Sequence, residues 1–128
     1  MSVLEAFKKL KAEGKKIVVV TSYEYWSAKI LNDTDVNGIL IGDDSAMVIH
    51  GHEDTLLSDV ETIAMHTRAV KKGAKDKFLI AAMPFMSNRK SFEESMDNVE
   101  ILMKAGANAL KIEGVDGNEE LYAHLSQS

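Results

Sequence analysis

Short apolar runs alternate with amphipathic stretches along the whole chain. Four of the runs, bounded by glycine or polar residues, have the length of strands and are predicted as such: Ile17–Val20, Gly38–Gly42, Phe78–Ala82 and Ala109–Ile112. A continuous run of β-branched or aliphatic residues is typical of a parallel strand that is covered on both sides. The first two strands are therefore expected to be buried on both faces.

Between the strands, apolar residues recur every three or four positions, which is the period of a helix with one buried face. The predicted helices are Val3–Glu13, Tyr23–Asn32, Ser58–Gly73, Ser91–Gly106 and Asn118–Gln127. Ser58 or Asp59 is expected to cap the third helix, and Ser91 with Glu94 has the spacing of a capping box. The stretch Asp43–Leu57 is predicted to be a long polar loop.

This order of elements predicts an α/β fold of four βα units. Strands that alternate with helices form a parallel sheet with right-handed crossovers. Two architectures have this order: a doubly wound open sheet, and half of a (β/α)8 TIM barrel. A complete barrel needs at least about 200 residues, and the chain has 128. Residues 1–128 are therefore expected to form a single (βα)4 domain, and the periodicity leaves both architectures open.

The composition excludes several classes of protein. Cysteine is absent, which rules out disulfides and thiolate metal sites. The net charge is −5 and the basic residues are scattered, so nucleic acid is not expected as a partner. No apolar run has the roughly 18 residues that a transmembrane helix needs, and the N-terminal stretch lacks the apolar core of a signal peptide. These features favour the cytoplasm and no membrane contact.

Candidate chemistry lies where the strands end, because ligands of parallel α/β folds bind beyond the carboxyl ends of the strands. Asp43 follows the second strand and Glu113 follows the fourth. Carboxylates from separate strands suit Mg²⁺, which takes one or two of them and keeps several waters. Lys111 precedes Glu113 by two residues, so both point to one side, where a lysine suits a bound anion. The spacing is equally consistent with Asp43 and Asp44 capping a turn and with Lys111 and Glu113 forming a surface pair.

The histidines carry a weaker signal. His50 and His52 are one residue apart in the predicted loop, a spacing that suits two metal ligands but is more often plain surface. His66 lies beside the apolar face of a helix and is expected to pack with its ring satisfied. The sequence contains neither the glycine-rich phosphate-binding motifs nor the nucleophile motif Gly-x-Ser-x-Gly. Nucleotide-binding and serine hydrolase functions therefore have no support.

Segments at and after the predicted strands form an ordered series of motifs: TSYEYWSA (21–28), LIGDDSAMV (40–48), GHEDTL (51–56), HTRAVKKGA (66–74), MPFMS (83–87) and AGANALKIEG (105–114). In this order they resemble the ketopantoate hydroxymethyltransferase family. The resemblance extends over roughly residues 15 to 125, which is nearly the whole chain. Each motif is short, but their common order makes a chance resemblance improbable.

The resemblance implies a full (β/α)8 barrel, of which this chain would be the N-terminal half, in large homo-oligomers. The implied reaction transfers a hydroxymethyl group from methylenetetrahydrofolate to 3-methyl-2-oxobutanoate, which gives ketopantoate for pantothenate biosynthesis. In such enzymes Mg²⁺ chelates the 2-oxo acid and acts as a Lewis acid. The implied cofactor is thus Mg²⁺, and the implied partner is a small 2-oxo acid.

By the same resemblance, Asp43 and Glu113 correspond to metal ligands. The substrate-binding positions are Asp44, Ser45, Ala82 and Lys111, of which the lysine holds the 2-oxo acid. Two positions depart from the family, because Asp44 stands in place of a serine and Ala82 in place of an aspartate. If the alignment with the family is shifted by one residue, the family's Asp-Ser pair is restored as Asp44-Ser45. Asp44 would repel the substrate carboxylate but add to metal binding, and Ala82 removes an oxygen from the metal site.

The family's general base is a glutamate of the second half, so the resemblance predicts no catalytic residue in this chain and no complete reaction from it alone. A half barrel leaves its first and fourth strands as unpaired edges. The chain is therefore expected either to pair with another copy or to form an open doubly wound sheet. Two alternatives to the enzyme remain: a non-catalytic relative that keeps the fold, and another Mg²⁺-dependent carbon–carbon lyase that acts on a 2-oxo acid.

Overall fold

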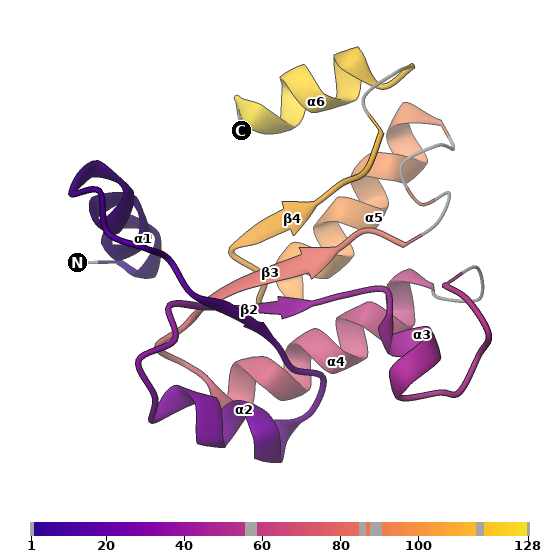
Figure 1. Cartoon of the computed structure of the whole chain (residues 1–128). Helices are drawn as coiled ribbons and strands as arrows, with labels where there is room; N and C mark the ends of the chain where they lie inside the picture. Colours follow the sequence, from indigo (N-terminus) through magenta and orange to yellow (C-terminus); the bar gives the residue numbers. More distant parts are fainter. Residues whose placement is uncertain (1, 56–58, 85–86, 88–90, 115–116, 128) are drawn as a thin grey trace.

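Four parallel strands form one sheet in the computed structural model, which describes residues 2–55, 59–84, 87, 91–114 and 117–127. The strands are β1 (Val19–Thr21), β2 (Gly38–Ile41), β3 (Phe78–Ala82) and β4 (Ala109–Lys111). They lie side by side in the order in which they occur along the chain, each paired with the next (Figure 1). The predicted parallel sheet is therefore confirmed.

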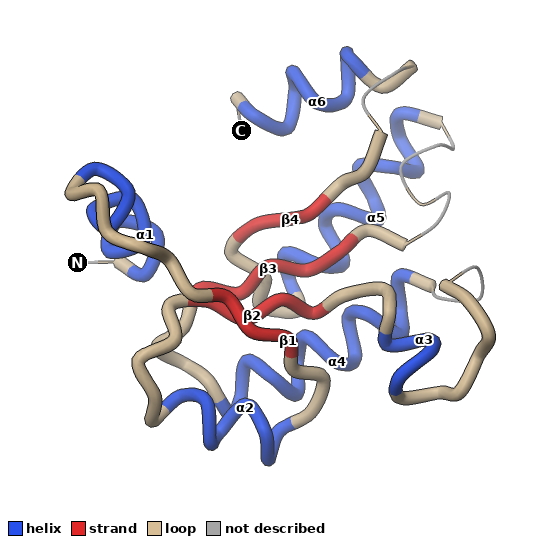
Figure 2. Tube along the Cα trace, viewed as in Figure 1, coloured by secondary structure: helices blue, strands red, loops and turns tan. Residues whose placement is uncertain are grey.

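The helices are α1 (Val3–Ala12), α2 (Tyr25–Asn32), α3 (Ser45–Val48), α4 (Val60–Gly73), α5 (Phe92–Lys104) and α6 (Glu119–Ser126). When the strand order of a parallel sheet never reverses, right-handed crossovers put all crossover helices on the same face. In this structure α2, α4 and α5 cover one face of the sheet (Figures 1 and 2). A doubly wound sheet would reverse its order and carry helices on both faces. The structure has the order of half a TIM barrel, and the doubly wound alternative is wrong. Within the described residues, no helix has the length and apolar character needed to cross a membrane.

The core lies between the sheet and the three crossover helices. Alternate side chains of the central strands point into it, and Ile39, Ile41, Leu79 and Ala81 are completely buried. The helices contribute smaller and branched side chains to the same cluster: Ala28, Ile63, Ala64, Val70, Val99 and Leu102. Leu40 and Ile80 alternate with these residues, face the opposite side of the sheet and are only partly buried.

That opposite face carries α1 near the amino ends of the strands. The ring of Phe7 in α1 stacks on the ring of Phe78 in β3, with centroids 4.2 Å apart and an interplanar angle of 16°. Phe78 precedes Leu79, so the two side chains point to opposite faces of the strand. The helix thus covers one end of the sheet, away from the carboxyl ends where the candidate site lies.

The α2–α4 contact is the most extensive between two helices of the described chain. At Gly73, the last residue of α4, an added Cβ would lie 2.6 Å from the carbonyl oxygen of Tyr25 and 2.9 Å from the backbone nitrogen of Lys29. Since both atoms belong to the backbone of α2, neither can rotate away. The absence of a side chain at Gly73 is what allows the helices to approach this closely.

Two expectations about local structure are wrong. The first strand begins at Val19 rather than Ile17, and Val18 and Val19 are 49% and 41% exposed instead of buried on both faces. β1 is an edge strand with one neighbour, so its apolar side chains are only partly covered. The predicted loop Asp43–Leu57 contains α3, a single turn that is too short to produce a periodic pattern.

The expected helix caps are present. The Asp59 carboxylate accepts the backbone N–H of Thr62 at 2.7 Å, and the Ser91 hydroxyl accepts that of Glu94 at 3.0 Å. Ser58, the alternative cap of α4, lies outside the described residues. Each cap satisfies a backbone donor that the first helical turn leaves unpaired and contributes about 1 kcal/mol.

Candidate functional site

The residues with candidate chemistry lie at the carboxyl edge of the sheet. Asp43 follows β2, Ala82 ends β3 and Lys111 ends β4. The register pairs Ile41 with Ala81 and Ala82 with Lys111, so these strand ends are level. Neighbouring strands lie about 4.8 Å apart, which puts the ends of β2 and β4 about 10 Å apart with Ala82 between them.

Asp44 folds back against the backbone of Gly42. Its Oδ1 accepts a hydrogen bond of 2.7 Å from the hydroxyl of Tyr23. The same oxygen occupies the space that a Cβ at position 42 would need. Glycine at this position therefore allows the Asp44–Tyr23 hydrogen bond, and Tyr23, from the segment after β1, fixes the orientation of the carboxylate.

The Tyr23 phenol is held in its neutral form. Burial, followed by the hydrogen bond to Asp44 and the negative charge of that carboxylate, raises the pKa of Tyr23 to about 12. We expect an alkaline titration to show a phenolate absorbance step near pH 12, and the Tyr23→Phe variant to lack this step. Because the folded state keeps the proton longer than an unfolded tyrosine with a pKa of about 10, stability should fall as the pH rises from about 10 to about 12. A midpoint of Tyr23 near 10 would contradict the hydrogen bond.

Lys111 and Glu113 form an ion pair at the surface. Their Nζ and Oε1 atoms are 3.2 Å apart, and the two side chains are 50% and 76% exposed. The expectation that both point to the same side is confirmed, and so is the alternative of a surface pair. An exposed pair of this kind contributes only about 0.2–1 kcal/mol, so a ligand can separate the two groups at little cost.

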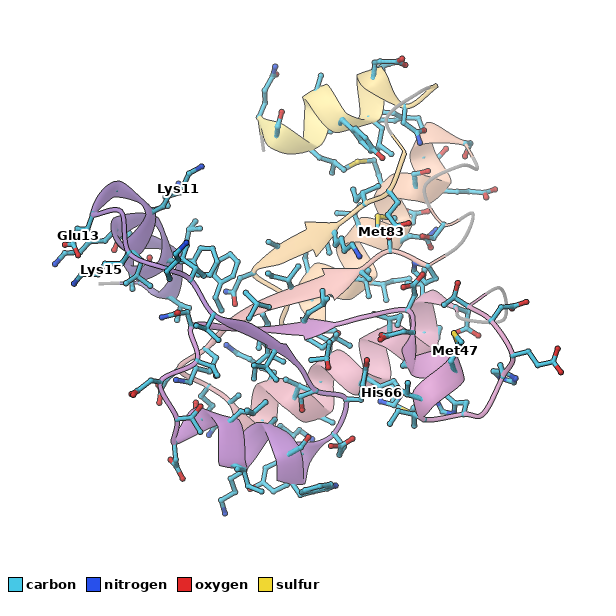
Figure 3. All side chains as sticks on the ribbon, in the orientation of Figure 1. Lys11, Glu13, Lys15, Met47, His66 and Met83 are labelled. Carbon is cyan, nitrogen blue, oxygen red and sulfur yellow. The ribbon has the colours of Figure 1, made fainter. Side chains whose placement is uncertain are left out.

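Ser45 and His66 are buried next to this edge. Ser45 begins α3, and its hydroxyl makes no hydrogen bond within the described chain. His66 of α4 lies beside α3 (Figure 3), with Nδ1 2.7 Å from the Tyr23 carbonyl oxygen and Nε2 3.2 Å from Nε2 of His50. The expectation that His66 packs with a satisfied ring is confirmed. Its contact with His50 has no signal in the sequence, because the two residues lie on different elements.

The described residues do not form a ready three-ligand metal cluster. Among them, no three histidine, aspartate or glutamate side chains are placed to hold one ion. A groove of about 520 Å³ lies elsewhere, between β4, α5 and α6, and is lined largely by apolar side chains such as Val99, Leu110 and Leu125, without a carboxylate. The acidic side chains at the carboxyl edge, rather than this groove, therefore carry the candidate metal chemistry.

A solved structure shares this fold. The crystal structure of 2,3-dimethylmalate lyase, a member of the PEP mutase/isocitrate lyase superfamily, superimposes with a TM-score of 0.66 at 13% identity. The superposition covers 88% of this chain and 39% of that one. At this identity the likeness concerns the fold alone.

Sequence relatives identify the family. The 3-methyl-2-oxobutanoate hydroxymethyltransferase of Coxiella burnetii is 48% identical over 118 residues, which are 92% of this chain and 44% of the relative. The enzyme of the same name from Bdellovibrio bacteriovorus is 46% identical over 128 residues, 100% of this chain and 49% of the relative. The chain thus spans about half the length of these curated relatives. A family model described as ketopantoate hydroxymethyltransferase matches residues 2–128, and the chain belongs to the ketopantoate hydroxymethyltransferase family.

Proposed function

We propose that these residues form the metal-binding and 2-oxo-acid-binding half of a 3-methyl-2-oxobutanoate hydroxymethyltransferase. The whole protein would transfer a hydroxymethyl group from methylenetetrahydrofolate to 3-methyl-2-oxobutanoate and so make ketopantoate for pantothenate biosynthesis. The observation that carries the proposal is the position of Asp43, Lys111 and Glu113 at one edge of the sheet, in a chain of this family.

The donor set at this edge fits Mg²⁺. Asp43 and Glu113 offer carboxylate oxygens on either side of Ala82, whose methyl group contributes no donor. Mg²⁺ is held in many sites by one or two carboxylates, with waters and substrate oxygens in its other positions. Two protein ligands are therefore sufficient without a third. When bound, the ion would supply Lewis acidity to the 2-oxo group of the substrate.

Lys111 would change its partner when the substrate binds. In the structure its ammonium group neutralises Glu113. Once Glu113 turns to the metal, Lys111 is released and can hold the carboxylate of the 2-oxo acid by charge and hydrogen bonding. The exchange replaces a weak exposed pair by two interactions that are better shielded from water, so metal and substrate should bind together rather than independently.

Asp44 would add to the attraction for the metal. It lies next to Asp43, and its hydrogen bond from Tyr23 leaves further lone pairs on the carboxylate. A second negative charge at this edge favours a divalent cation, and it opposes the carboxylate of a substrate that arrives without the cation. We therefore propose that Asp44 strengthens metal binding and makes substrate binding more dependent on the metal.

Several features of the whole enzyme stay predictions. The resemblance assigns the general base to a glutamate of the second half, so binding rather than turnover is the activity we propose for these residues. A cytoplasmic location and assembly into homo-oligomers also stay predictions. So does a contact between Ser45 and the substrate, because this side chain is completely buried and a ligand would reach it only after α3 moves.

Calorimetric titration of the chain with Mg²⁺ and 3-methyl-2-oxobutanoate together tests the proposal. We expect binding that needs both components. Glu113→Ala should weaken it at least about tenfold, because the loss of even a second-shell partner of a metal ligand costs about 10- to 100-fold. Glu119→Ala, which removes an exposed carboxylate from α6, is the matched control and should bind as the unmodified chain does.

A lack of binding by the unmodified chain would contradict the proposal. It would mean that Ala82 and the lack of a third ligand among the described residues leave the edge unable to hold the ion. It would favour a non-catalytic relative that keeps the fold. Equal binding by the unmodified chain and Glu113→Ala would also contradict it, because the metal would then lie elsewhere.

A further inference from the structure

His50 and His66 bring two imidazole nitrogens together beside the acidic edge, the carboxyl edge of the sheet with Asp43, Asp44 and Glu113. Their Nε2 atoms are 3.2 Å apart, and the ring centroids are separated by 5.4 Å. Zinc binds histidine nitrogen at about 2.0–2.1 Å, so two nitrogens on one tetrahedral zinc ion lie about 3.3 Å from each other. The separation in the structure is thus close to the one that two ligands of a single ion adopt.

The hydrogen bonds of His66 prepare its Nε2 as a ligand. A backbone carbonyl only accepts hydrogen bonds, so the contact between Nδ1 and the Tyr23 carbonyl requires the proton to be on Nδ1. Nε2 of the neutral ring then carries a lone pair that points at His50. Metal-binding histidines are commonly oriented by such a bond from the second ring nitrogen to a carbonyl. In the structure the lone pair accepts the Nε2 proton of His50.

The backbone around both histidines is held in place. His66 is buried, with 8% exposure, within the 14 residues of α4. His50 follows α3, and its backbone N–H donates to the Ser45 carbonyl at 3.1 Å. The next turn is held by a hydrogen bond of 2.9 Å from the N–H of His52 to the Ala46 carbonyl. Little ordering of the backbone would therefore be required when an ion binds.

We propose that His50 and His66 bind a divalent transition-metal ion of the Zn²⁺, Ni²⁺ or Cu²⁺ class. The ion would lie between the two Nε2 atoms. The single ring proton of neutral His50 would move from Nε2 to Nδ1 by exchange with water, and waters would complete the coordination. Neutral imidazole suits these ions, whereas Mg²⁺ prefers oxygen, so this site differs from the acidic edge in the ions that it selects. The bound ion would connect α3 to α4.

His52 is excluded from the site. Although its ring centroid lies 6.4 Å from that of His50, no third histidine or acidic side chain of the described residues is placed to share an ion with the pair. A two-histidine site of this kind exchanges its ion with solvent more readily than a closed structural site with four protein ligands. The proposal therefore concerns reversible binding rather than an ion required for folding.

Calorimetric titration of the chain with Zn²⁺ at neutral pH, in the presence of excess Mg²⁺, tests this site. We expect one ion per chain, and at least about tenfold weaker binding by His50→Gln. His52→Gln is the matched control from the same loop, and Asp43→Asn is the control for the acidic edge; both should bind Zn²⁺ as the unmodified chain does. His50 is exposed, so its replacement leaves the core intact.

Three outcomes would overturn the proposal. The first is no Zn²⁺ binding by the unmodified chain. The second is unchanged binding by His50→Gln. The third is a loss of Zn²⁺ affinity in His52→Gln or Asp43→Asn as large as that in His50→Gln. The ion would then be held by His50 and His52 together, or by the acidic edge. The His66→Gln variant should lose binding like His50→Gln, and its circular dichroism spectrum separates loss of a ligand from loss of the fold.

Discussion

Replacement of Leu79 by alanine should lower the free energy of unfolding by about 2–5 kcal/mol, the range measured for buried leucines. Leu79 is completely buried in β3, between the sheet and the crossover helices. β3 is paired on both sides, with β2 and β4, so its backbone cannot move to fill the cavity. The cost therefore includes the lost burial of the side chain and the void that remains.

Urea denaturation of the two proteins measures this difference. The matched control is Leu4→Ala in α1, where the leucine is 42% exposed and the expected loss is below about 1 kcal/mol. The midpoint of the Leu79→Ala transition should shift while the slope stays the same, since the surface exposed on unfolding hardly changes. Similar losses in both variants would show that the core does not lie on the helix-covered side of the sheet.

Gly73→Ala should destabilise the chain by about 1–3 kcal/mol, as overpacking of a close contact does. The new methyl group would meet the Tyr25 carbonyl oxygen at 2.6 Å and the Ala28 Cβ at 3.0 Å. Alanine is the better helix former by about 1 kcal/mol in a helix interior, but Gly73 is the last residue of α4, where little of that gain applies. The clash with α2 therefore outweighs the gain in helix propensity, and the substitution lowers the free energy of unfolding.

Thermal and urea unfolding measure this second effect. Lys72→Ala, one residue earlier on the exposed side of α4, is the control and should change stability by less than about 0.5 kcal/mol. A Gly73→Ala variant that is more stable than the unmodified chain would mean that helix propensity dominates and that α2 and α4 are not in backbone contact.

The sequence predicts the elements that local patterns determine. The apolar runs locate all four strands to within two residues, and the cap residues Asp59 and Ser91 begin their helices as expected. The alternation of strands and helices also predicts a parallel sheet. Periodicity does not determine strand order, so the choice between the half barrel and the doubly wound sheet depended on the structure. The exposure of β1 was missed for the same reason, because an apolar run does not reveal whether a strand lies at an edge.

The candidate site was predicted only in part. The strand ends predict the positions of Asp43, Lys111 and Glu113, since any residue after a parallel strand lies at the same edge. The Tyr23–Asp44 and His50–His66 contacts join different elements. They depend on how α3 and the segment after β1 pack, and no spacing in the sequence encodes that packing.

The stacking of Phe7 on Phe78 has a consequence for synthesis on the ribosome. Each strand of the sheet pairs with the strand made just before it, so the βα units can assemble one after another as the chain emerges. α1 is made first, but its aromatic partner belongs to β3 and appears only after two βα units have been translated. Until then the Phe7 ring can contact only β2, where it lies beside Gly38. This helix therefore completes its aromatic contact only after β3 has been translated, and its apolar side stays more exposed to chaperones until then.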